Sequence, residues 1–484
     1  MATIPSPSSL PIDRAIAGSP ELSLPQDRRR PAPPSLPRRA FLVASAIAVS
    51  SGGSLWRQAV SEAGAQETRD SVNEPASGPA ETDRRPGPSN VTAAMRDRMQ
   101  GLLIGGLLGD ALGGPVEFVS QSEVASVMPG ARQWPESRRL DEVERQRLAE
   151  SLPLLSYDKL RPEPAPYAQW PDLAAAGTVT DDSRHKIVLM RTLQRAVQDR
   201  RTATPADLAR QYLQFTPRAG QIPQGKLRGL SEEGFREYQL AARWLLGDRD
   251  ESQALPVERL WSGIANCSGQ MLLLPLAVAY ADRPIEAYRA AFGLDFIDAP
   301  LARDMAAALV AGLARALSPA LDASPPGERW SQLLAAMRNT DPWRMSEVPF
   351  AGRPLHDWLD RAADFATSAR GQPARLYRLL EEQGRPVYWW DAHFTLLVPL
   401  AMLHFCEFDP LAAMHLTLDF GHDTDSYAQV LGALVGAVHG AAVFPATMRT
   451  IVQQRVLADF GEEVPGGWLE TLLAYRALAT NGKS

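Results

Sequence analysis

Two short acidic clusters, more than two hundred residues apart, carry the residue types best suited to chemistry. Residues 180–183 read Thr-Asp-Asp-Ser, and residues 423–426 read Asp-Thr-Asp-Ser. Each cluster joins carboxylates to hydroxyl side chains, which are hard oxygen ligands that suit Mg²⁺, Mn²⁺ or Ca²⁺ rather than zinc or copper. If the fold brings the clusters together, their four carboxylates surround a site for two divalent cations.

Helix capping is the competing explanation for the same residues. Ser, Thr and Asp are preferred N-cap residues, and carboxylates in a first turn interact favourably with the helix dipole. Ile187, Met190 and Leu193 follow the first cluster at helical spacing. Val430 and Leu434 follow the second cluster in the same way. A cap explains either cluster alone, whereas the shared composition of the two favours a functional site.

Two apolar segments contain glycine at every fourth position. Such stripes let two helix backbones approach closely, and their propensity cost of up to ~1 kcal/mol per glycine needs a packing reason. We therefore expect two close-packed core helices, and charged or polar residues that bound both segments disfavour a membrane-spanning alternative. The first helix leads to Asp110 and Glu117, and the second directly follows the second acidic cluster. The glycines are Gly101, Gly105, Gly109, Gly432, Gly436 and Gly440.

Helical periodicity dominates the chain from Val91 onward. Residues 301–317, 330–338, 355–369 and 396–405 all repeat apolar positions with a period near 3.6, and Pro and Gly separate such segments. Runs of β-branched residues long enough for a sheet are absent from the sequence. The pattern predicts an all-α fold with one large domain.

The first ninety residues differ from the rest in composition. Residues 1–37 are rich in Pro, Ser and Arg without apolar periodicity, which is typical of disorder. Arg38 and Arg39 then precede a short apolar run that ends near the small residues Ala-Gly-Ala. We predict a disordered leader with a twin-arginine signal peptide over 1–65, followed by a polar linker over 66–90.

This leader predicts export to the periplasm by the twin-arginine route. The alternative is a cytoplasmic protein with a disordered basic tail. The apolar run is too short to favour a stable membrane anchor. The catalytic domain would then span 91–484, interrupted by a Pro-rich insertion over 129–171 that carries one charged helix over 140–152. The role of this insertion is not decided by the sequence.

Charge and cysteine content narrow the function further. The formal net charge is -6 and no Lys/Arg block occurs in the body of the chain, so a nucleic-acid surface is not indicated. Two cysteines, Cys267 and Cys406, exclude a disulfide framework and a cysteine-based zinc site. Their apolar surroundings predict buried free thiols, with a single bridge as the alternative. We expect a monomer.

Three segments, in this order, resemble the ADP-ribosylglycohydrolase family, which includes the dinitrogenase-reductase-activating glycohydrolases. Residues 105–117 are similar to the family's Gly-Asp-Ala-x-Gly-x-Pro-x-Glu opening. Residues 180–183 stand where the family has Thr-Asp-Asp-Thr, and residues 421–426 where it has Gly-Gly-Asp-Thr-Asp-Thr. The resemblance covers the chain from about Ala94 to Gly440 and implies a single large orthogonal helical bundle of this family's type.

The resemblance also implies two bound Mg²⁺ or Mn²⁺ ions and hydrolysis of the glycosidic bond at the C1″ carbon of an ADP-ribosyl group. Glu117 matches the family's catalytic glutamate, and Asp110 would act beside it by orienting the loop. Ser183 and Thr424 would serve as helix caps. The implied metal ligands are Thr180, Asp181, Asp182, Asp423, Asp425 and Ser426.

Substrate contacts are expected from Gly114, Met271 and His422. Two departures from the family pattern fall here, since His422 replaces a glycine and Leu272 replaces an arginine in a partial fourth motif. The aromatic run over 388–390 is interpreted either as a stacking surface for a base or as core packing.

The leading hypothesis is a metal-dependent hydrolase that acts on ADP-ribosylated protein or on a related ribosyl conjugate. A di-metal phosphoesterase is the second hypothesis, although such enzymes normally recruit histidine ligands as well. A non-catalytic, Mg²⁺-dependent ADP-ribose-binding or structural relative is the third. The presence of Glu117 and of every aspartate favours the enzyme.

Overall fold

The computed structural model describes seven parts of the chain. The predicted leader, the linker and residues 129–133 and 157–171 of the Pro-rich insertion lie outside them. One compact unit spans Arg84–Ser484. The described residues are 91–118, 124, 134–156, 175–215, 226–349, 352–384 and 386–481.

Helices make up the architecture of the described residues, which contain no strand and one isolated bridge between Asn266 and Asp391. The all-α prediction is thus confirmed. Several helices begin with proline at the first turn, where its missing N–H is not needed. The elements are α2 Ala93–Gly113, η1 Gly114–Val116, α4 Glu142–Glu150, α5 Asp181–Gln198, α6 Pro205–Gln214, α7 Lys226–Leu245, η3 Val257–Gly263, α8 Ser268–Leu272, α9 Leu276–Ala279, α10 Pro284–Leu294, α11 Pro300–Ala316, η4 Pro319–Leu321, α12 Pro326–Asn339, η5 Met345–Glu347, α13 Pro354–Ser368, α14 Pro373–Gln383, α15 Ala392–Phe405, α16 Pro410–Phe420, α17 Thr424–His439, η6 Ala441–Val443, α18 Ala446–Phe460 and α19 Gly466–Asn481.

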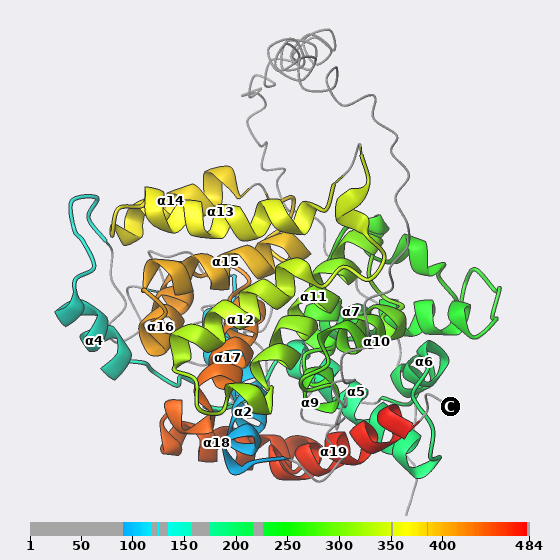
Figure 1. Cartoon of the computed structure of the whole chain (residues 1–484). Coiled ribbons are helices and arrows are strands. Elements are labelled where there is room, and N and C mark those ends of the chain that lie inside the picture. The colour runs from blue at the N-terminus through cyan, green and yellow to red at the C-terminus, as the bar shows by residue number, and fades with distance from the viewer. Residues whose placement is uncertain are drawn as a thin grey trace, which may run out of the picture. The chain divides into compact units, whose positions relative to one another are not determined.

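The two glycine-striped helices, α2 and α17, pack against each other at the centre of the bundle (Figure 1). A Cβ atom on Gly105 would lie 2.2 Å from the carbonyl oxygen of Gly432, and one on Gly436 would lie 1.9 Å from that of Gly101. Real Cβ atoms essentially never approach so closely, so glycine is required on both sides of this seam. The prediction of close-packed core helices is confirmed.

The seam continues to the end of α2 and places it beside the start of α17. A Cβ atom on Gly113 would lie 2.6 Å from the Cα atom of Asp425. The short helix η1 follows, and Glu117 comes directly after it in extended conformation. The backbone packing therefore sets how far Glu117 lies from the second acidic cluster.

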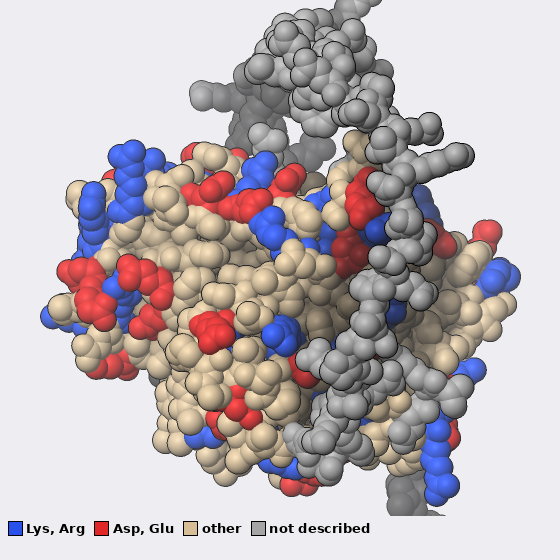
Figure 2. All heavy atoms as spheres, in the orientation of Figure 1, with Lys and Arg blue, Asp and Glu red and all other residues tan. Residues whose placement is uncertain are grey.

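The other helices surround this pair. In the view of Figure 1, α13 and α14 lie across the top of the bundle and α18 and α19 along the bottom. Helix α17 is buried from Thr424 to Val438, as expected for a central helix. Acidic and basic side chains are interspersed over the face shown in Figure 2. Among the described residues, no helix combines the length and apolar character needed to cross a bilayer.

A buried ion pair lies outside the seam, on α11. Asp304 on α11 accepts hydrogen bonds from Nε and Nη2 of Arg353, at 3.0 and 2.7 Å, and from the hydroxyl of Tyr288. The Arg353 side chain is fully buried. Cys267 and Cys406 are both buried free thiols, which confirms the first of the two expectations for them.

Candidate metal centre

Carboxylates from three distant segments meet at the end of the glycine seam. Oxygen atoms of Glu117, Asp423 and Asp425 all lie within 4.8 Å of one another. Oxygen atoms of Asp181, Asp182 and Asp425 form a second such group. Asp425 belongs to both groups, so the five side chains form one continuous carboxylate cluster. The two acidic motifs, which the sequence only places at two helix starts, are thus adjacent in space.

Asp110 holds the first motif in place from the neighbouring helix. Its two carboxylate oxygens accept hydrogen bonds from the backbone N–H groups of Thr180 and Ser183, each at 3.0 Å. The hydroxyl of Thr180 accepts the N–H of Asp182 at 3.2 Å and caps α5. A carboxylate from α2 therefore binds the positive end of α5, as the helix dipole favours. Asp110 orients the site from outside the carboxylate cluster.

The hydroxyl residues of the two motifs have different roles from those expected. The hydroxyl of Ser183 has no hydrogen-bond partner, and that of Thr424 donates to the backbone oxygen of His422 at 3.3 Å. The expectation that these two residues cap their helices is wrong, because Thr180 and Asp110 already satisfy the start of α5. Ser426, by contrast, links the motifs, since its hydroxyl donates to Asp182 Oδ2 at 3.3 Å.

The electrostatics of the cluster are compatible with cation binding. Burial, reinforced by neighbouring carboxylates, raises the pKa of Asp423 to about 7 and moves the pKa of Asp182 and Asp425 well above the usual range. Burial also raises the pKa of Asp181. Asp182 Oδ1 and Asp423 Oδ2 are buried without a hydrogen-bond partner.

Buried carboxylate oxygens without donors are costly unless a counter-charge reaches them. The oxygen-only ligand set and the spacing of the cluster fit hard divalent cations such as Mg²⁺ or Mn²⁺. Asp425, which both groups share, could contribute a ligand oxygen to a cation in either group.

Lys186 is a residue at the site that the sequence interpretation missed. It follows Asp182 by one helical turn, is 2% exposed, and donates from Nζ to the backbone oxygen of Asp182 at 3.2 Å. Burial lowers its pKa, while four aspartates, including Asp182 and Asp425, oppose that shift. The i, i+4 spacing from Asp182 is the signal that could have revealed it.

The expected substrate-binding residues occupy different surroundings. Gly114 is the first residue of η1, which directly precedes Glu117, and it is buried. Met271 is buried on α8, where its sulfur lies 3.6 Å from Cys267 Sγ. Cys267 Sγ in turn lies 3.7 Å from the hydroxyl of Ser426, so this end of α8 borders the cluster. Leu272 is fully buried in the core.

His422 packs against aromatic side chains next to the second acidic motif. Its ring stacks on Trp389 with centroids 3.7 Å apart, and its Nε2 bonds to Glu381 at 3.0 Å. Its backbone oxygen accepts the N–H of Phe118 at 2.5 Å, which ties the loop of Glu117 to the second motif. The backbone of His422 therefore holds the loop of Glu117 in place, and its ring nitrogen Nε2 is directed to Glu381.

Further aromatic side chains lie near His422. Trp389 packs inward, against His422 and Phe394. Tyr388 stacks on Trp390 at 5.0 Å, and Phe118 meets Trp390 edge-on at 6.0 Å. Phe118 and Tyr388 are each 41% exposed. Core packing thus applies to Trp389, whereas Tyr388 is exposed, and stacking of a base on it stays a prediction.

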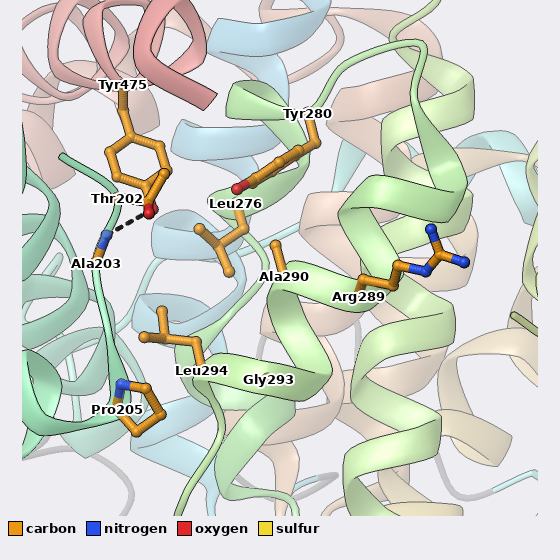
Figure 3. Close-up of a pocket in the computed structure, with 10 residues that line it drawn as sticks. All are labelled: Thr202, Ala203, Pro205, Leu276, Tyr280, Arg289, Ala290, Gly293, Leu294 and Tyr475. Atoms are coloured by element: carbon orange, nitrogen blue, oxygen red, sulfur yellow. Dashed lines mark hydrogen bonds between the residues drawn. The ribbon is translucent and has the colours of Figure 1, made fainter. Parts of the chain in front are cut away.

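A separate hollow of about 240 Å³ lies elsewhere on the molecule (Figure 3). It is formed by residues of α9, α10 and α19 and the segment before α6, and the hydroxyl of Tyr475 there accepts the N–H of Ala203 at 3.0 Å. The side chain of Arg289 extends away from it. The hollow shares no residue with the carboxylate cluster.

The chain was compared with known protein families, curated proteins and solved structures. A family model described as ADP-ribosylglycohydrolase matches residues 91–482. The chain is also similar to a solved structure described as "ADP-ribosylglycohydrolase-related protein complex", with 20% sequence identity over 80% of this chain and 100% of that chain and a TM-score of 0.44. No curated protein matches the sequence. Because the family model spans most of its length, this all-α chain belongs to the ADP-ribosylglycohydrolase family.

Proposed function

We propose that this protein is a Mg²⁺- or Mn²⁺-dependent hydrolase that cleaves the glycosidic bond at the ribose C1″ carbon of an ADP-ribosylated protein or a related ribosyl conjugate. Membership of the family supports a glycohydrolase-type activity. The observation that carries the finer proposal is the position of Asp425, which belongs at once to a carboxylate group containing Glu117 and to one containing Asp182.

Glu117 is the residue placed for proton transfer. It is 3% exposed, lies outside the helices, and is held next to the second motif by the Phe118–His422 backbone bond. A carboxyl group there can take a proton from water or give one to the leaving group, a contribution of typically ~10²–10⁴-fold. The aspartates stabilise the positive charge that develops at the ribose carbon as the bond breaks. When bound, the metal pair would supply orientation of the substrate and charge stabilisation.

The competing enzyme class finds less support at the site. Histidine ligands would favour a di-metal phosphoesterase, but neither histidine near the motifs joins the carboxylate cluster. His185 is fully buried and its Nδ1 bonds to the Tyr212 hydroxyl at 2.6 Å, while His422 bonds to Glu381. The non-catalytic alternative is disfavoured by the position of Glu117, whose carboxylate oxygen lies within 4.8 Å of those of Asp423 and Asp425.

The decisive experiment is calorimetric binding of ADP-ribose with Mg²⁺ and with EDTA. We expect binding only with Mg²⁺, and its loss in Asp182→Ala, because this substitution removes a carboxylate from the cluster. Asp360→Ala, on an exposed ion pair with Arg338, serves as control and should bind normally. Equal binding in EDTA would refute the metal-dependent site. Metal binding without ADP-ribose binding would restrict the substrate to other ribosyl conjugates.

Catalysis is tested separately with Glu117→Gln. We expect this variant to keep Mg²⁺-dependent binding of ADP-ribose and to lose about 10²–10⁴-fold in the rate of ribosyl-bond hydrolysis. Unchanged hydrolysis would exclude Glu117 as the acid or base.

We also propose that the protein is exported to the periplasm. The support is the Arg38-Arg39 pair before an apolar run, and these residues lie outside those the structure describes. Replacing both arginines by lysine should retain the protein in the cytoplasmic fraction of a bacterial host. Export of that variant at the normal level would contradict the proposal.

A further inference from the structure

We propose that Lys186 supplies a fixed positive charge to the carboxylate cluster, which stabilises the protein without metal and weakens its binding of divalent cations. Lys186 is thus a positioning and charge-balancing residue that acts through the aspartates. The inference rests on the proposed metal centre, and the experiment below separates the two.

The position of the lysine side chain is set by helix packing. Lys186 lies on the same face of α5 as Asp182, one turn further along, so that its side chain runs beside the acidic first turn. Its stem passes α2 at Gly106, where a Cβ atom would lie 3.6 Å from Lys186 Cε. Nζ donates to the backbone oxygen of Asp182. The side chain is therefore confined between two core helices.

The charges around this ammonium group are mostly negative. Four aspartates from three helices act on it: Asp110 on α2, Asp181 and Asp182 on α5, and Asp425 on α17. The charge of Lys186 lowers the pKa of Asp182, against the larger effect of burial. The charge of Arg184 likewise lowers the pKa of Asp181. A buried lysine is costly unless paired, so its location here requires a compensating role.

The positive charge of Lys186 has opposite effects on the stability of the metal-free protein and on its affinity for divalent cations. Without metal, the ammonium group offsets the mutual repulsion of the buried carboxylates. With metal, the same group repels each divalent cation that enters the cluster, because charges in a buried site interact strongly. A lysine with a packing role only would produce neither effect.

The test replaces Lys186 by methionine, which keeps the length of the side chain and removes its charge. We expect Lys186→Met to bind Mn²⁺ about tenfold more tightly in calorimetry, since one repelling charge is gone. Its melting temperature should fall in EDTA more than in saturating Mg²⁺. Lys186→Arg keeps the charge and should bind Mn²⁺ more weakly than Lys186→Met.

Arg191→Met is the matched control. Arg191 lies on the same helix and pairs with Glu462 at 2.9 Å, away from the carboxylate cluster, so its loss should leave Mn²⁺ affinity unchanged. Unchanged or weaker Mn²⁺ binding by Lys186→Met would overturn the inference. An equal fall of its melting temperature in EDTA and in Mg²⁺ would do the same. If Lys186→Met does not fold, Lys186→Gln is measured in the same way.

Failure of the proposed function gives a different pattern. If the wild-type protein binds no divalent cation, the metal-dependent function fails, but the measurements in EDTA still test the charge of Lys186. A larger loss of stability in EDTA for Lys186→Met than for Arg191→Met then supports charge compensation. An equal loss in the two variants refutes it.

Discussion

Two groups of buried carboxylates in this bundle have opposite surroundings. Asp304, on α11, accepts hydrogen bonds from Nε and Nη2 of Arg353 and from a tyrosine hydroxyl. Asp182 and Asp425, at the starts of α5 and α17, lie instead among other carboxylates. Asp182 also keeps one oxygen without a hydrogen-bond partner. The first carboxylate is fully paired within the protein, whereas the second group is not.

The difference separates a structural ion pair from a site. A buried carboxylate with a guanidinium partner has its charge and its hydrogen bonds satisfied by the fold. A buried cluster with unpaired oxygens and more carboxylates than cationic side chains has negative charge in excess, which a ligand from outside the chain can neutralise. Burial alone therefore does not identify a functional carboxylate, and the identity of its partners does.

The largest effect should follow from Arg353→Met, which leaves Asp304 buried without its counter-ion. We expect a loss of about 3–5 kcal/mol in the free energy of unfolding, measured with denaturant, as for other broken buried pairs. The loss should be the same with Mg²⁺ and with EDTA. Arg96→Met provides the comparison, because its pair with Glu470 is exposed. That loss should stay below about 1 kcal/mol.

Asp425→Asn should act in the opposite direction. It removes one charge from the cluster, and its Oδ1 can still accept the N–H of Ser426, which Asp425 accepts at 2.9 Å. In EDTA the free energy of unfolding should rise by about 1 kcal/mol, because a buried, repelled charge is gone. The stabilisation by added Mg²⁺ should disappear. A loss in EDTA as large as that of Arg353→Met would contradict the contrast.

The stability of the protein in EDTA should also depend on pH. The pKa of Asp423 in the folded protein, about 7, lies above its value of about 3.9 in an unfolded chain. The unfolded chain therefore releases this proton first, so the contribution of Asp423 is complete below about pH 4 and is lost as the pH rises to about 7. Urea unfolding should show a steeper loss of stability over this range for wild type than for Asp423→Asn. Equal slopes would show that Asp423 titrates normally.

Local sequence patterns were sufficient to predict the main elements of the fold. The glycine stripes of Gly105 and Gly432 predict a backbone contact because glycine has no Cβ atom to keep the two helices apart. The acidic motifs predict helix starts, and α5 begins at Asp181 as the pattern indicates. These predictions succeed because periodicity and capping are properties of neighbouring residues.

The remaining features depend on contacts between distant segments. Lys186 reads in the sequence as an ordinary polar helix residue, and its burial results from the packing of α5 against Gly106. The ring of His422 is directed by Trp389 and Glu381, on segments that only the folded chain brings near. Ser183 could serve as a cap from its residue type alone, but Thr180 is the N-cap of α5, and Asp110 accepts the N–H of Ser183 itself.

The seam between α2 and α17 has a consequence for how the protein is made. Its two helices start at Ala93 and Thr424, at opposite ends of the helical region. Glu117 is synthesised early, but the aspartates that complete its surroundings emerge from the ribosome only after most of the chain. Helix α2 therefore has no packing partner until α17 has been synthesised, and contacts between residues so far apart in the sequence form slowly. A truncated or stalled chain would contain Glu117 and the first acidic motif and still have no site.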